Sequence, residues 1–394
     1  INSNATKRSH TYNPLLRGNA IDIKNRIMTA FKWENEYYKA ESDSILSTIL
    51  KAVDYLDKKL TFRDLYILLT YKKALTKLAK KIDDDSLRHD IKKDLLSDFS
   101  KMKELTSGLR ANINKMANFE LGDILNTYDP DIDLLNAYQN NEIIYITLPT
   151  QSLEETAKFF GKLLLMDLKS TGGYIEDKEI ETKFFPVFID EFAEFATEEF
   201  NTWLSKARSA GFSIHMAHQS LGDLEQVNDA FTTQVIDNTN VKIMFRVNSN
   251  KTAEDYAGQL GTYQTTKETE RVSKTNIKES EDYMGSVREV EEYIENPNKL
   301  KKELQRGQAL IFGSHPKDFY SIINTDYLPD PEEFHEIVLD RKNKNHFDNE
   351  GLYMEELILN DIEEEQTDSK INDPINNNNN INKPINKKFK LKPF

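Results

Sequence analysis

The chain has 394 residues, of which 38% are hydrophobic and 30% charged, and it contains no cysteine. This length and composition are typical of a folded protein of two or three domains and exclude a small disulfide-stapled peptide. No apolar run approaches the roughly 18 residues of a membrane-spanning helix. The formal net charge of −14 argues against a protein that coats DNA through overall positive charge.

The segment 33–119 is predicted to be helical. Its apolar residues, such as Ile45 and Ile49, recur at spacings of three and four, and strand signals are missing. Thr61 is followed three residues later by Asp64, a variant of the capping box that marks a helix start. We therefore expect a helical domain before the rest of the chain.

From residue 142 the pattern changes to short apolar runs that alternate with amphipathic helices. Strands are expected at 143–148, 184–189, 212–217, 241–247 and 309–312. Strands joined by helices are typical of a parallel sheet, whose ligands bind beyond the carboxyl ends of the strands. The fold class is therefore α/β, and the chemistry is expected where these strands end.

The end of the chain loses this core-like patterning. An acidic run at 363–365 leads into an Asn-rich run at 376–380 and then into several lysines. Such a composition buries too little apolar surface to order itself. We expect residues 331–394 to be a mostly disordered tail.

Two acids at the end of a predicted strand are the most informative feature. Asp190 and Glu191 directly follow the apolar run 184–189. This is the geometry of a Walker B element, in which the first acid helps to hold Mg²⁺ and the second polarises water for attack on a γ-phosphate. The alternative is an apolar strand followed by a solvent-exposed turn, and the pattern alone favours neither.

Two residues further along shift this balance. Arg208 lies near the end of the next predicted helix, and Gln219 follows the next predicted strand. Such a Gln can read the γ-phosphate and orient water, and such an Arg can reach a neighbouring subunit's nucleotide as an arginine finger. Each has a plain alternative, a helix-terminal Arg favoured by the dipole and a Gln in an ordinary loop. The ordered set of acids, Arg and Gln favours an ATPase.

Three stretches of the chain resemble the FtsK/HerA superfamily of hexameric motor ATPases; they read VFIDEFAEFA, SKARSAGFSIHMAHQSLGDLE and NTNVKIMFRVNS. Within this superfamily the chain looks most like type IV coupling proteins of the TraD/TraG kind. That branch is favoured by YNPL near the start, by the helical insert and by ELQRGQALIF at 303–312. The resemblance covers most of residues 12–330 and not the tail.

The resemblance implies ATP and Mg²⁺ as cofactors and gives single residues their roles. Asp190 would be the Mg²⁺-side acid, Glu191 the catalytic glutamate and Gln219 the γ-phosphate sensor. Arg208 would be the finger that acts in trans. Arg246, after the strand at 241–247, is a weaker candidate for nucleotide binding, with equal weight on a surface ion pair.

The resemblance also implies an organisation and partners. Residues 1–32 would begin a RecA-like P-loop NTPase core, 33–128 would be an inserted all-α domain, and 129–330 would complete the core with its parallel sheet and Walker B element. Coupling proteins are inner-membrane ATPases that act on the cytoplasmic side. We expect a homo-hexamer with single- or double-stranded DNA in the ring pore, relaxosome or effector proteins as substrates, and contacts with type IV secretion channel components.

One family motif is missing from the sequence. The Walker A pattern G-x-x-x-x-G-K-[ST] does not occur, and Gly161-Lys162 lies in a predicted amphipathic helix without an earlier glycine at the required spacing. In the family this loop and the membrane helices precede the NPL segment. We therefore expect a truncation upstream of Ile1, and a chain that by itself binds ATP poorly and does not turn it over. His218 also replaces a small residue or Thr of the family.

Other interpretations stay open. One is an FtsK/HerA-type DNA translocase, and another is a non-catalytic adaptor that keeps the fold and docks substrates. His215 and His218 could suggest a metal pair, but residues three apart on a strand face opposite ways. Trp33, Tyr37 and Tyr38 could stack on DNA bases, although packing within the helical domain is favoured.

Overall fold

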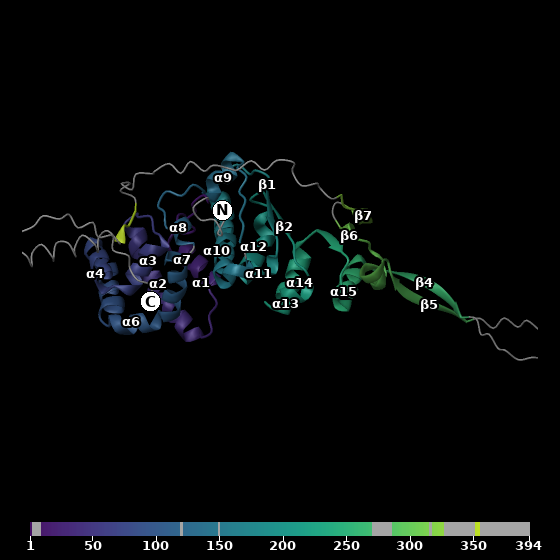
Figure 1. Ribbon diagram of the computed structural model, residues 1–394, viewed down its shortest axis with the longest axis horizontal. Helices are drawn as coiled ribbons and strands as arrows, with labels where there is room; N and C mark the ends of the chain where they lie inside the picture. The colour runs from purple at the N-terminus through teal and green to yellow at the C-terminus, as the bar shows by residue number, and fades with distance from the viewer. Residues whose placement is uncertain are drawn as a thin grey trace, which may run out of the picture.

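The computed structural model describes residues 1, 9–118, 121–148, 150–269, 286–314, 317–326 and 351–354. Figure 1 shows an elongated molecule in which a helical part lies beside a part of mixed helices and strands, with a two-stranded ribbon at the far end. Within these residues, no helix combines the length and the apolar composition that crossing a membrane requires.

Helices fill the segment in which apolar residues recur at helical spacing. They are α2 (Glu36–Tyr55), α3 (Phe62–Thr70), α4 (Lys72–Lys81), α5 (Asp85–Asp90), the π-helical turn η2 (Ile91–Leu96), α6 (Phe99–Leu105), α7 (Ser107–Asn118) and α8 (Gly122–Leu125). The expected cap is present: the Thr61 side chain accepts the Asp64 N–H, and Asp64 accepts the Thr61 N–H at 3.0 Å. This reciprocal pair satisfies donors at the start of α3. The bounds of 33–128 as a separate domain stay a prediction.

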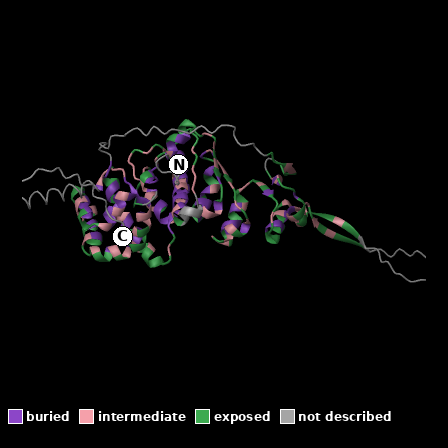
Figure 2. Ribbon diagram, in the orientation of Figure 1, coloured by how far each residue is buried: buried purple, intermediate pink, exposed green. Residues whose placement is uncertain are grey.

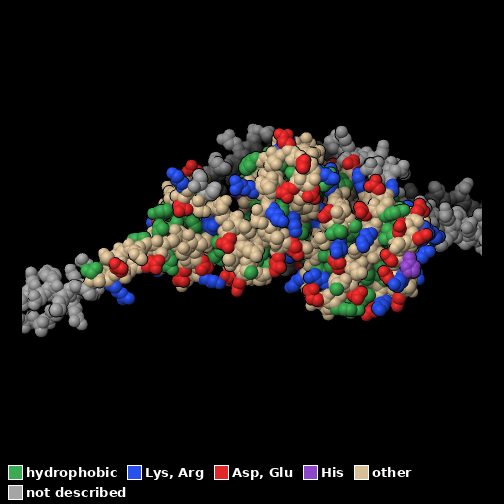
Figure 3. Space-filling model, turned by 180° about the vertical axis from the view of Figure 1, so that it is seen from behind, with side chains coloured by type: hydrophobic (Ala, Val, Ile, Leu, Met, Phe, Trp, Pro, Cys, Tyr) green, Lys and Arg blue, Asp and Glu red, His purple; other side chains and the backbone are tan. Residues whose placement is uncertain are grey.

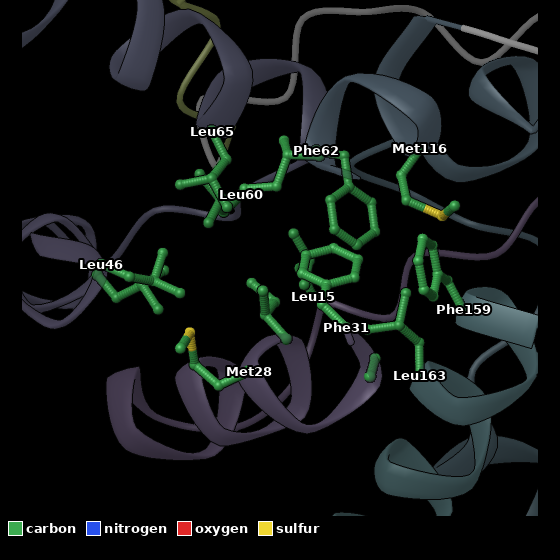
Figure 4. Close-up of a cluster of buried hydrophobic side chains, with 14 of the residues drawn as sticks. Leu15, Met28, Phe31, Leu46, Leu60, Phe62, Leu65, Met116, Phe159 and Leu163 are labelled. Atoms are coloured by element: carbon green, nitrogen blue, oxygen red, sulfur yellow. The ribbon is translucent and has the colours of Figure 1, made fainter. Parts of the chain in front are cut away.

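The core of the helical part also contains residues from the segments that precede and follow it in the sequence. Leu15 comes from the segment before α1 (Ala20–Ala30), and it lies with Leu60 and Phe62 of the helical part and Phe159 of α10 (Thr150–Asp177) in one buried cluster (Figure 4). Each of these side chains is at most 7% exposed. The helical part is thus packed against the core that precedes and follows it.

Asn13, in the YNPL stretch, links two loops of the helical part. The Asn13 side-chain amide donates to the carbonyls of Leu60 and Thr127, both at 2.9 Å. Its oxygen accepts the Leu15 N–H at 2.9 Å. Leu60 precedes α3 and Thr127 follows α8, so one buried side chain bridges the entry to and the exit from these helices.

A buried ion pair joins the same segment to α10. Arg26 and Asp167 are almost fully buried, and Arg26 Nη2 lies 2.9 Å from Asp167 Oδ1. The Tyr12 hydroxyl donates to the other carboxylate oxygen. Because both carboxylate oxygens have partners, the charge is compensated inside the core.

The α/β part begins with two parallel strands. β1 (Phe185–Ile189) pairs with β2 (Phe212–Met216), and Phe185 lies opposite Phe212. α11 (Phe192–Phe195) and α12 (Glu198–Ala207) connect them, as expected for strands joined by helices. Gly211 ends this connection with φ +81°, and a Cβ there would lie 2.0 Å from the Lys183 carbonyl oxygen. Only glycine fits this entry to β2.

The later strands depart from the single parallel sheet that the sequence predicts. β3 (Val241–Phe245) pairs antiparallel with β6 (Gln308–Gly313), which pairs antiparallel with β7 (Phe319–Asn324). Between β3 and β6 the chain forms α15 (Asn250–Leu260), the strands β4 (Thr262–Thr269) and β5 (Ser286–Tyr293), and the turn η3 (Lys299–Glu303). The return path therefore contains a ribbon rather than one crossover helix, and β6 can run antiparallel.

Two further expectations meet the structure differently. The predicted strand at 143–148 is extended chain without a regular ladder, in which Tyr145 O accepts from the Ile1 amino group and Thr147 N donates to Ile1 O. This prediction is wrong because an apolar run becomes a strand only beside a partner strand. The predicted tail at 331–394 lies outside the described residues, apart from 351–354, which pack on the helical part.

Candidate functional site

The chain turns sharply where β1 ends, and this turn places the acid pair. Glu191 has φ 49° and ψ 42°, a left-handed conformation that is unusual for a residue with a side chain. Its N–H donates to Asp190 Oδ1 at 3.0 Å. The next residue, Phe192, is buried, and its N–H donates to the Ala217 carbonyl at 2.8 Å beyond the end of β2. The turn thus directs both carboxylates to the carboxyl edge of the β1–β2 pair.

Gln219 lies at the same edge and contacts the second acid. Its Nε2 donates to the Glu191 carboxylate at 3.0 Å to Oε1 and 3.3 Å to Oε2. Because β1 and β2 are parallel and in register, the residues that follow each strand meet at one edge. Two side chains that lie 28 residues apart in the sequence are therefore brought together. Asp190, Glu191 and Gln219 are exposed or partly exposed, so a ligand can reach them.

The two candidate arginines lie elsewhere. Arg208 is the exposed residue that ends α12, three residues before Gly211 and close to the start of β2. The start of β2 lies opposite the start of β1, so Arg208 is a strand length, on the order of 15 Å, from Glu191. Arg246 is exposed directly after β3. Within the described residues, no hydrogen bond or ion pair joins either arginine to the acid pair.

The two histidines have separate surroundings. The His215 ring stacks on Phe188 with centroids 4.5 Å apart. His218 Nδ1 lies 3.0 Å from the Ser220 carbonyl oxygen, which can only accept, so Nδ1 carries the proton in this contact. Ser220 caps α13 (Leu221–Glu225) together with Asp223. His218 therefore holds the loop that carries Gln219.

Gly161-Lys162 does not form a phosphate-binding turn. Both residues lie within α10, as expected. A Cβ on Gly161 would lie 2.2 Å from the Phe195 ring, so the glycine allows α10 and α11 to pack closely. Burial lowers the pKa of Lys162. This glycine is explained by helix packing.

Tyr138 is a positioning residue that sequence reasoning missed. It is fully buried in α9 (Leu134–Asn140), its hydroxyl donates to the Ala210 carbonyl at 3.0 Å, and it accepts the Lys183 N–H at 2.6 Å. It thereby holds together the segments that enter β1 and β2. Nothing in the local pattern signals this role, because the partners lie 45 and 72 residues away.

Two clefts in the described residues lie away from the acid pair. One of about 350 Å³ is lined by α1, α2 and the segment 57–60. Another of about 560 Å³ lies between α13, α14 (Asp229–Asn238) and α15. Neither is lined by Asp190 or Glu191. The acid pair stands on an open edge of the sheet.

Part of the α/β region matches a known family model. Residues 185–302 match the family model described as the TraM recognition site of TraD and TraG, and this match includes β1, β2, the acid pair and Gln219. This segment is similar to the TraM recognition site of the TraD and TraG proteins. No curated protein sequence matches the chain.

Solved structures of a conjugative coupling protein are similar to this chain in fold. The unbound bacterial conjugative coupling protein TrwBdeltaN70 is similar with a TM-score of 0.55 and 16% identity over 81% of this chain and 71% of that one. TrwB with ADP and Mg²⁺ has a TM-score of 0.53 at 15% identity, with 81% and 72% of the two chains covered. TrwB with the ATP analogue ADPNP gives 0.54 at 15% identity and the same coverage. At this level of identity the similarity shows the fold, which is the RecA-like P-loop fold of TrwB.

Proposed function

We propose that the chain is the cytoplasmic portion of a coupling ATPase that recruits DNA–protein substrates and translocates them to a conjugation or secretion channel. The contact between Gln219 and Glu191 at the carboxyl edge of β1 and β2 is the observation that supports this proposal most directly. An acid pair with an amide donor at this edge is the arrangement expected for hydrolysis of a nucleoside triphosphate.

The residues at this edge fit the metal and water side of such a site. Asp190 offers carboxylate oxygens, the ligands that Mg²⁺ prefers. Mg²⁺ bound with ATP supplies positive charge that offsets the charge developing on the phosphates. Glu191 takes the proton of the attacking water, and Gln219 holds the Glu191 carboxylate and reads the γ-phosphate. The sequence contains no Walker A pattern, so the phosphate-binding groups are not among these residues.

In this proposal, Arg208 acts on the nucleotide bound to a neighbouring subunit. It is exposed and lies about a strand length from the Glu191 of its own chain, so it cannot act on the same nucleotide. In a homo-hexameric ring, an exposed arginine at a helix end can reach the next subunit's nucleotide. Arg246 is a second basic residue of this kind. DNA passes through the ring pore, and relaxosome or effector proteins and channel components bind outside it at the inner membrane.

The test is DNA-stimulated ATP hydrolysis, measured on the full-length protein. Glu191→Gln is expected to lower kcat by at least 100-fold, on the scale of a lost catalytic base. Glu199→Gln, an exposed acid in the first turn of α12, is the matched control and leaves kcat unchanged. Hydrolysis that is undiminished in Glu191→Gln would contradict the proposal.

A non-catalytic adaptor with the same fold is the competing function, favoured by the missing Walker A pattern. Nucleotide binding separates the two. The ATPase proposal expects saturable, Mg²⁺-dependent binding of a labelled ATP analogue to the extended protein. An adaptor shows none, although it keeps its substrate partners.

A further inference from the structure

Residues 351–354, with the sequence Gly-Leu-Tyr-Met, lie against the helical part, far along the chain from it. Gly351 forms a parallel bridge with Lys59, and the Leu352 N–H donates to the Lys59 carbonyl at 3.0 Å. Figure 1 shows this short segment beside α3, on the opposite side of the molecule from β6 and β7. The chain therefore leaves the sheet and returns to the helical part.

The side chains of this segment are inserted rather than laid on the surface. Leu352 is 3% exposed and Met354 is fully buried. The Tyr353 ring contacts the Tyr128 ring with centroids 4.4 Å apart. Buried apolar side chains and an aromatic ring packed against another ring are common anchors of a peptide in a binding site.

The backbone of the segment is also bound, because its N–H groups donate hydrogen bonds to the helical part. The Tyr353 N–H donates to the Tyr128 hydroxyl at 3.0 Å, and the Met354 N–H donates to Asp64 Oδ1 at 3.0 Å. Tyr128 in turn donates to Asp64 Oδ2 at 2.7 Å. With the Leu352 N–H, three successive amides each have an acceptor on the helical part. A specific binding site is expected to give each buried N–H an acceptor, because a buried N–H without a hydrogen bond is energetically costly.

Asp64 is central to this arrangement. Its side chain also caps α3 by accepting from the Thr61 N–H and hydroxyl at 3.0 and 2.8 Å. Oδ2 serves the cap and Tyr128, while Oδ1 takes the Met354 N–H. The third residue of α3 thus both caps this helix and presents an acceptor to the segment.

The first position of the segment admits only glycine. A Cβ on Gly351 would lie 2.5 Å from Tyr353 Cε2 and 2.9 Å from Tyr128 Cγ. Tyr353 itself has φ 49°, so the chain turns back on the glycine after the buried leucine. The position of Gly351 therefore leaves no room for a side chain unless the two tyrosine rings move.

We propose that Lys59, Asp64, Tyr128 and their surroundings form a peptide-binding site on the helical part, and that the chain's own Gly351–Met354 is its ligand. The segment acts as a docking motif that attaches the chain at residues 351–354 to the helical part rather than to the sheet. Its tether within the same chain raises its effective concentration, so a four-residue motif suffices. A peptide with the same pattern competes for the site.

Displacement of the motif tests this proposal. The full chain carrying Leu352→Asp and Met354→Asp loses its own ligand and keeps Lys59, Asp64 and Tyr128. A fluorescein-labelled peptide of residues 348–356 is expected to bind this variant at least tenfold more tightly than it binds the wild-type chain, by anisotropy. The same peptide with Gly351→Val is the control and does not bind. Equal binding to both chains, or none to a variant that keeps its circular dichroism spectrum, would overturn the proposal.

A second measurement needs no peptide. Hydrogen exchange on the wild-type full chain should show slowed exchange at the amides of Leu352, Tyr353 and Met354, and Gly351→Val should release all three together. Unprotected amides in the wild-type chain would contradict a bound motif. Protection that appears only as the protein concentration rises would assign the site to the motif of a second copy instead of the chain's own.

Discussion

The helical part and the strands that carry the acid pair differ in how completely they are covered. In the helical part the apolar stripe of each helix meets another helix, and its core residues are almost all fully buried. On one face of β1, Phe185, Val187 and Ile189 pack against the core, but Phe188 on the other face is 76% exposed. Figure 2 shows the contrast between buried purple turns in the helical part and green exposed strands.

β3 and the extended segment at 143–148 also leave apolar side chains exposed. Val241, Ile243 and Phe245, on alternate positions of β3, are about half exposed, and Ile143 and Tyr145 are 99% and 80% exposed. Seen from behind, the surface over the α/β part shows such apolar side chains among many charged ones (Figure 3). A parallel sheet ordinarily has both faces covered. Helices can thus close a core among themselves, whereas a parallel pair such as β1 and β2 needs a covering layer on each face.

The largest effect is expected at the buried ion pair that joins α1 to α10. Asp167→Ala leaves the buried Arg26 guanidinium without its carboxylate, which should lower the free energy of unfolding by about 3–5 kcal/mol. Asp43→Ala removes a more exposed partner of Lys24 and should cost less than about 1 kcal/mol. The free energy of unfolding of both variants is measured by urea denaturation. Equal losses of stability in the two variants would mean that the buried ion pair contributes no more than the exposed one.

A smaller effect tests the packing of α10 on α11. Gly161→Ala places a methyl group 2.2 Å from the Phe195 ring, which should destabilise the chain by about 1–3 kcal/mol. Gly173→Ala lies on the same helix with open space around its Cβ, and it should stabilise the chain by up to about 1 kcal/mol through helix propensity. Thermal unfolding should move in opposite directions in the two variants. A shift of the same sign in both would contradict the close approach.

The pH dependence of stability tests the buried carboxylate that serves the docking motif. Burial raises the pKa of Asp64 above its ordinary value of 3.8. The folded chain then holds a proton that the unfolded chain has lost, so this group's contribution to stability falls as pH rises from about 4 through the raised pKa. The wild-type chain should therefore lose stability relative to Asp64→Asn as pH rises from 4 to 7, by urea unfolding. A difference that is flat or grows with pH would refute this direction.

The smallest effect is expected on the exposed face of β1. Phe188→Ser should change the free energy of unfolding by no more than about 0.5 kcal/mol, because the ring is largely solvated. Phe212→Ala, at a 5% exposed position on β2, should cost about 3–5 kcal/mol. Phe188→Ser should also reduce binding of the dye anilinonaphthalene sulfonate, which reports exposed apolar surface. A large loss of stability would mean that this face is covered.

Local patterns predicted much of what the structure contains. The capping residues before α3, the helical spacing of the insert, the strands at β1 and β2 and the acid pair behind β1 all follow from neighbours in sequence. They are predictable because periodicity, caps and strand ends depend on residues a few positions apart. The roles of Arg208 and Arg246 stay predictions, since they depend on contacts that this chain does not make with itself.

By itself, therefore, the sequence determined the helical insert, the strand ends and the acid pair of this protein. Only the tertiary structure decided the antiparallel pairing of β3 with β6, the contact of Gln219 with Glu191, and the return of residues 351–354 to the helical part. The physical reason is distance along the chain: Met354 and Asp64 are 290 residues apart. A hydrogen bond across such a separation forms only when packing elsewhere has already brought its two partners together.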